Sequence, residues 1–145
     1  MRRIVSLVLV LCLISMCGCQ PQTTPTAFDL ERFGVTQAEI EEQHQKYGKL
    51  KNGSKLEDEY ALDRLIIIVY PFAYHIDYVP EHFAEVGCVD VIVLSEPNLD
   101  NDSPNRVIEV IIRPTTKQGI LDAVRLLEQR ADIYYVCPDG LYSIT

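Results

Sequence analysis

The chain has 145 residues and a formal net charge of −8, set by 13 basic and 21 acidic residues. That length suits a single domain. The acidic balance repels nucleic-acid phosphates and anionic lipid headgroups, so it excludes nucleic acid as an expected partner and disfavours direct adsorption to a membrane surface.

The first predicted element is a secretory signal peptide over residues 1–18. Arg2 and Arg3 form a short positive region, and the apolar run from Ile4 to Ile14 spans 11 residues. A membrane-spanning helix needs about 20 apolar residues, so this run is too short and is typical of an export signal. Its removal leaves 11 basic against 21 acidic residues, which makes the mature chain more acidic.

The signal ends in the sequence MCGC, residues 16–19, and a polar QPQTTPT stretch follows. This pattern resembles the lipobox of bacterial lipoproteins, although Met16 stands where Leu is usual and Cys17 where Ser or Ala is usual. The resemblance implies that Cys19 becomes a diacylated first residue, with the two chains that stable anchoring needs. The protein would then be lipid-anchored in the bacterial cell membrane and face away from the cytoplasm. An ordinary signal peptide with incidental cysteines is the alternative.

Two N-terminal regions precede the main domain. Residues 19–35 are expected to hold the lipidated cysteine and a flexible linker, and residues 36–59 a helix followed by a polar loop. Thr36 and Glu39 have the spacing of a capping box, and Gly48 can end the helix. The apolar face of this helix is thin, so we expect it to be largely solvated.

Residues 60–145 have the pattern of a compact domain. Runs of β-branched residues and two amphipathic segments predict six elements, at 64–70 (strand), 79–87 (helix), 89–95 (strand), 106–113 (strand), 115–131 (helix) and 133–137 (strand). Thr115 and Gln118 have capping-box spacing at the start of the second helix. The order β-α-β-β-α-β predicts an α+β, ferredoxin-like sandwich, in which two helices cover one face of a four-stranded antiparallel sheet.

The first strand is apolar on both of its faces. Leu65, Ile67 and Val69 lie on one face, and Ile66, Ile68 and Tyr70 on the other. A sheet that is covered on one side only should alternate apolar with polar residues. Either residues 28–47 cover the second face, or a partner protein does.

The stretch from Ile120 to Ile144 resembles the end of a subtilisin-type propeptide. That family ends on a helix, a loop and an aliphatic-x-Tyr-Val-Glu-x-Asp strand, and Ile133, Tyr135, Val136 and Asp139 stand at the matching places. Cys137 replaces the usual Glu. The βαββαβ pattern over residues 64–144 agrees with the family's compact domain.

The resemblance implies a non-catalytic role as inhibitor or chaperone of a subtilisin-like serine protease. The open face of the sheet would contact two parallel helices of the protease, and Asp139 would cap one of them. The residues that follow Gly140 would enter the substrate cleft as an extended strand; they are Leu141, Tyr142, Ser143, Ile144 and Thr145. An envelope structural or interaction module without a protease target is the alternative.

The sequence shows no arrangement that is typical of an enzyme. His75 and His82 lie near acidic residues, but without a metal-binding spacing, and a Cys88–His82 pair lacks an orienting third residue. We therefore expect no cofactor, metal or small-molecule substrate. Cys88 and Cys137 would lie on opposite sheet edges, roughly 14 Å apart, too far for a disulfide, so we predict two free and mostly buried thiols.

Overall fold

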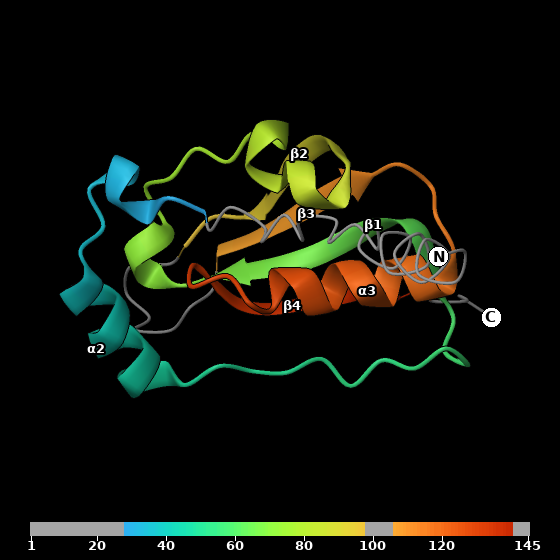
Figure 1. Ribbon diagram of the computed structural model, residues 1–145, viewed down its shortest axis with the longest axis horizontal. Helices are drawn as coiled ribbons and strands as arrows, with labels where there is room; N and C mark the ends of the chain where they lie inside the picture. Colours follow the sequence, from blue (N-terminus) through green and yellow to red (C-terminus); the bar gives the residue numbers. More distant parts are fainter. Residues whose placement is uncertain (1–27, 98–105, 141–145) are drawn as a thin grey trace, which may run out of the picture.

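The computed structural model describes residues 28–97 and 106–140, and its centre is one antiparallel sheet (Figure 1). The strands are β1 (Tyr60–Val69), β2 (Cys88–Ser95), β3 (Arg106–Ile112) and β4 (Ile133–Gly140). Their order in the sheet is β2-β3-β1-β4. The predicted α+β class and the succession of elements are confirmed, and both are consistent with a ferredoxin-like fold.

The first strand of the chain lies at the middle of the sheet. Ile67 of β1 pairs with Ile108 of β3 on one side and with Val136 of β4 on the other, both antiparallel. The predicted placement of the last strand beside the first is therefore confirmed. β2 and β4 form the two edges of the sheet.

Two strands are longer than the sequence pattern predicts. β1 begins at Tyr60, and β4 continues through Pro138 and Asp139 to Gly140, which pairs with Tyr60. Proline donates no backbone hydrogen bond, but an edge strand tolerates it where its nitrogen faces outward. The expectation that the strand ends at Cys137 is therefore wrong, and Asp139 lies within β4.

One face of the sheet is covered by α3 (Lys117–Leu127) and by the 3₁₀ helix η3 (Pro80–Val86) (Figure 1). α3 begins after Thr116, whose hydroxyl accepts from the backbone N–H of Gly119 at 3.1 Å. The predicted capping box at Thr115 and Gln118 is wrong by one residue. The Thr115 N–H instead donates to the carbonyl of Leu62, which holds the start of the helix against β1.

The first covering element is less regular than predicted. A helix was expected over residues 79–87, but η3 has seven residues and a non-helical backbone at Phe83 (φ −129°). Gly87 ends it in the left-handed region at φ 71°, which glycine adopts without strain. Phe83 is fully buried, whereas Val79, expected on the same apolar face, is 37% exposed.

The core lies between the sheet and these two elements. Alternate residues of the central strands point into it, as do Ile120, Val124 and Leu127 of α3. Burying each such side chain contributes about 1.5–3 kcal/mol. The strand contributors are Leu65, Ile67, Val69, Ile108, Val110 and Ile112.

The N-terminal segment packs at one end of this core. It contains η1 (Leu30–Phe33) and α2 (Gln37–Tyr47), and the predicted capping box between Thr36 and Glu39 is confirmed. α2 has no buried residue, as its thin apolar face predicted, whereas Leu30 and Val35 are buried. Figure 1 shows α2 beyond the end of the sheet, so residues 28–47 do not cover the sheet's second face.

Candidate protein-binding surface

The face of the sheet opposite α3 and η3, here called the reverse face, is the candidate site. Strand alternation places on it the side chains that lie between the buried core positions. They are Arg64, Ile66, Ile68, Asp90, Ile92, Val107, Glu109, Ile111, Tyr135 and Cys137. Asp90 and Ile92 are exposed, and the others are half-buried.

Strand register arranges the apolar members in a row across the sheet. Ile68 of β1 pairs with Val107 on β3 and with Tyr135 on β4. One pair of residues further along, Ile66 pairs with Cys137 and with Glu109. The reverse face is thus aliphatic and aromatic at its centre, with one carboxylate among these residues.

That carboxylate has a cationic partner. Arg64 Nη1 lies 3.3 Å from Glu109 Oε1, and Arg64 Nε lies 3.0 Å from Asp63 Oδ1. The hydrogen bond from Arg64 lowers the pKa of Asp63, so that carboxylate is charged at neutral pH. Pairing with Arg64 compensates the charge of Glu109, whose side chain is 12% exposed. A partner protein could therefore cover this part of the face without burying an unpaired charge.

The two thiols of the described sheet are free, as predicted, but half-buried instead of mostly buried. Burial raises the pKa of both Cys88 and Cys137, which keeps them protonated at neutral pH. Burial likewise raises the pKa of Tyr135 beside Cys137. Protonated thiols are weak nucleophiles, so Cys137 adds a small apolar group to the reverse face.

The sequence-predicted site residues fall in three places. Asp139 is half-buried within β4, one residue from the end of that strand. Cys19, the predicted lipid attachment point, lies outside the described residues. The predicted cleft-binding residues 141–145 also lie outside them.

Sequence reasoning missed a buried charged cluster at the turn between α3 and β4. Arg130 donates to Asp132 at 2.7 and 3.0 Å, and the Tyr78 hydroxyl donates to the same carboxylate at 2.8 Å. The Arg130 guanidinium also lies over two aromatic rings, 4.0 Å from the centroid of Phe28 and 4.6 Å from that of Phe83. The cluster joins the N-terminal segment, η3 and the α3–β4 turn, so its role is structural.

The histidines that raised the metal hypothesis make contacts inside the fold. His75 Nε2 lies 2.7 Å from the carbonyl of Phe33, and the His82 ring packs against Phe28, Phe33 and Tyr78. Burial lowers the pKa of His82, with a further contribution from Arg130. Within residues 28–97 and 106–140, no group of three or more His, Cys, Asp or Glu side chains could hold a metal ion.

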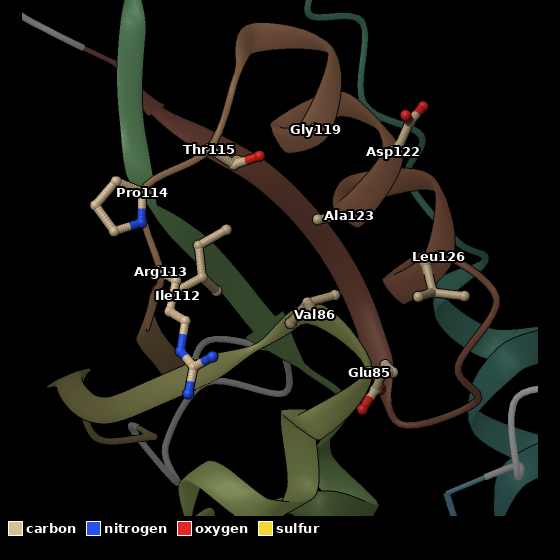
Figure 2. A pocket seen from close by; sticks show the side chains of 10 residues that line it. All are labelled: Glu85, Val86, Ile112, Arg113, Pro114, Thr115, Gly119, Asp122, Ala123 and Leu126. Atoms are coloured by element: carbon tan, nitrogen blue, oxygen red, sulfur yellow. The ribbon is translucent and has the colours of Figure 1, made fainter.

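A shallow groove of about 380 Å³ lies between η3 and α3 on the helix side (Figure 2). Its apolar wall includes Val86, Ile112 and Ala123, and Glu85 and Arg113 stand at its rim. No buried polar group is left unsatisfied among its lining residues in the described part of the chain. Its two carboxylates are already paired, Glu85 with Arg130 at 3.1 Å and Asp122 with Arg125 at 2.8 Å, so the groove is a weaker candidate for a ligand site than the reverse face.

Comparison of the chain with protein-family models, with curated proteins and with solved structures found no significant match. In the part of the chain that the structure describes, no helix is long and apolar enough to cross a membrane.

Proposed function

We propose that this protein is a non-catalytic, protein-binding bacterial lipoprotein, attached to the membrane through Cys19 and facing outward. The observation that supports it best is the reverse face, which is apolar at its centre and lies opposite both covering elements. Half-buried Ile66 and Ile68 on the central strand are the positions that a one-sided sheet would be expected to make polar. A contiguous apolar patch of this kind marks an interaction surface.

The proposed partner is a subtilisin-like protease, and the proposed mechanism is occupation without catalysis. The sheet face would dock on a helical surface of the enzyme, and residues 141–145 would lie in the substrate cleft as an extended strand. Support comes from the residues that match the propeptide pattern, Tyr135 and Asp139 among them.

An envelope interaction module without a protease target is the second proposal. It is favoured by Cys137, because this neutral, half-buried thiol replaces the Glu that would cap a protease helix. In this case the reverse face would bind another envelope protein.

Competition with a broad-specificity subtilisin tests the first proposal. The full chain should slow hydrolysis of a peptide substrate competitively, and removal of residues 141–145 should abolish that inhibition. Ile68→Lys should weaken it at least tenfold, because it places a charge in the middle of the reverse face. Leu56→Lys is the matched control, since Leu56 is 49% exposed in the loop before β1. A full chain that never slows the protease, or that is digested by it, rejects the inhibitor proposal.

Fractionation tests the anchor separately. Cys19→Ala should release the protein from membranes into the soluble fraction. Unchanged membrane retention of that variant would reject lipid attachment at Cys19 and leave the binding proposal intact.

A further inference from the structure

The outer edge of the sheet at β2 has a concentration of exposed apolar side chains. Of the eight large hydrophobic residues exposed in the described part of the chain, four lie on this strand. They are Val89 (50% exposed), Ile92 (41%), Val93 (43%) and Leu94 (51%). An edge strand also presents unpaired backbone N–H and C=O groups, for which an added strand is the natural partner.

The apolar residues occupy both sides of β2. Ile92 pairs with Glu109 and points to the reverse face, whereas Val93 pairs with Ile108, whose side chain lies in the core on the helix side. A strand added at this edge must therefore be apolar on both sides too. The acidic protein would attract a basic segment at long range. Such a segment would place its charges against valine and isoleucine, so it fits this edge poorly.

We propose that β2 of a second copy of this chain is that strand, paired antiparallel about a two-fold axis through Ile92. The sequence of β2, CVDVIVLS, is apolar on both sides and so complements itself. In a continuous sheet, paired residues share a face, which brings Val91 opposite Val93 of the second copy. The result is an eight-stranded sheet whose two reverse faces form one surface.

The charges of the strand permit this pairing. Asp90 is the one charged residue of β2, and pairing about Ile92 sets it opposite Leu94 of the second copy. The two Asp90 residues are then four positions apart along the strand, about 13 Å at 3.3 Å per residue. That separation exceeds the Debye length of about 8 Å at physiological ionic strength, so their repulsion is screened.

Cysteine cross-linking on the full chain tests the pairing. In a background in which all five native cysteines (12, 17, 19, 88 and 137) are replaced by serine, single cysteines are placed at 89, 91, 92 and 93 and oxidised, so that the test does not depend on the lipid anchor. Residues paired across an antiparallel ladder have Cα atoms about 4.5–5.5 Å apart, within the range of a disulfide. Ile92→Cys should therefore give the highest yield of dimer on a non-reducing gel.

Val89→Cys is the matched control, because it lies on the same strand and is at least as exposed as Ile92. Its two copies would be about 20 Å apart at 3.3 Å per residue, so it should give no dimer above background. The yield at position 92 should rise with salt, since screening weakens the repulsion between two acidic chains. Absence of a dimer, or a yield that does not peak at 92, overturns the proposal. Cross-linking at 92 to a different protein overturns it too and indicates a heterologous strand.

Discussion

The two edge strands of the sheet, β4 and β2, differ in the contacts that the structure describes beside them. At β4, the polar segment after α2 runs alongside: the Leu50 N–H donates to the Tyr134 carbonyl at 3.2 Å, and Lys49 Nζ donates to the Arg130 carbonyl at 2.5 Å. The Asn52 N–H donates to the side-chain carboxylate of Glu128, at the end of α3, at 2.7 Å. At β2 the structure describes no such cover. In the described residues, the chain itself therefore covers the start of the β4 edge, at Tyr134, and β2 is the edge at which we propose pairing.

β2 does have modest features that limit pairing. Register shifts occur between Cys88 and Asp90 and between Val93 and Ser95, so its ladder with β3 is irregular near both ends. The Asp90 carboxylate accepts from the Val91 N–H at 2.9 Å and so occupies a donor of the strand's own backbone. Such irregularities and charges restrain edge-to-edge association. The register is regular from Val91 to Val93, where the proposed two-fold axis lies, and pairing there requires Asp90 to release the Val91 N–H.

The largest effect is expected at the cluster that fastens the N-terminal segment beside β4. Asp132→Ala leaves the Arg130 guanidinium and the Tyr78 hydroxyl buried without their shared acceptor. Removing one partner of a buried ion pair costs about 3–5 kcal/mol. Glu85, 3.1 Å from Arg130 Nη1, compensates part of the charge that remains, so urea unfolding at pH 7 should show a loss at the lower end of that range. The double variant Arg130→Met with Asp132→Ala should lose less than the sum of the single variants. Strict additivity would show that the two side chains are not coupled in the folded state.

The strand order and the cap of α2 illustrate what sequence reasoning can reach. Runs such as Leu65 to Val69 are long and β-branched, so their assignment to strands needs no tertiary information. The Thr36 cap was found because its partner Glu39 sits at a fixed spacing. The cap of α3 was missed by one residue, because Thr115 and Thr116 are adjacent and either can precede the same helix. The backbone bond from Thr115 to Leu62 decides between them, and it is a long-range contact.

The candidate site, too, is predictable from the sequence only in part. The apolar reverse face followed from alternation along a single strand, but the salt bridge between Arg64 and Glu109 depends on the register between strands. The buried cluster was out of reach because Arg130 and Asp132 are ordinary residues of a helix–strand turn in sequence. Their contacts come from distant parts of the chain: Phe28, about a hundred residues earlier, lies against Arg130, and the Tyr78 hydroxyl donates to Asp132.

A second effect concerns Tyr70, whose hydroxyl donates to the carbonyl of Gly48 at the start of the covered β4 edge. Burial raises the pKa of Tyr70 from 10 to about 12. The unfolded chain then loses this proton at lower pH than the folded chain does, so the stability that Tyr70 contributes is present below pH 10 and is lost as pH rises to 12. The loss is at most about 2–3 kcal/mol, given 1.36 kcal/mol per unit of pKa.

Comparison with Tyr70→Phe isolates this effect. The stability of the parent relative to Tyr70→Phe should fall between pH 10 and 12 and be constant from pH 7 to 9. Urea unfolding at each pH measures it. Parallel pH profiles for the two proteins would show that Tyr70 ionises normally in the folded state.

A third and smaller effect is expected where the polar segment meets β4. Leu50→Pro removes the N–H that donates to Tyr134 and should cost about 0.5–1.5 kcal/mol. Hydrogen exchange at β4 should also become faster, because its edge is less covered. Leu56→Pro is the control: Leu56 is similarly exposed, and it occupies the second position of a turn closed by the Asp58 N–H and the Lys55 carbonyl, where proline is favoured. Equal losses for the two variants would mean that the bond to Tyr134 contributes nothing.

The smallest effect is expected at the open edge. Val89 on β2 is 50% exposed, so Val89→Thr should change the free energy of unfolding by no more than about 0.5 kcal/mol. The same substitution at Val110 of β3, which is fully buried, places a hydroxyl in the core and should cost about 1–3 kcal/mol. Urea unfolding of the two variants compares them directly, since the change in atoms is identical. A loss at Val89 as large as that at Val110 would mean that β2 is already covered in the isolated chain. The contrast between an open and a closed edge would then no longer hold.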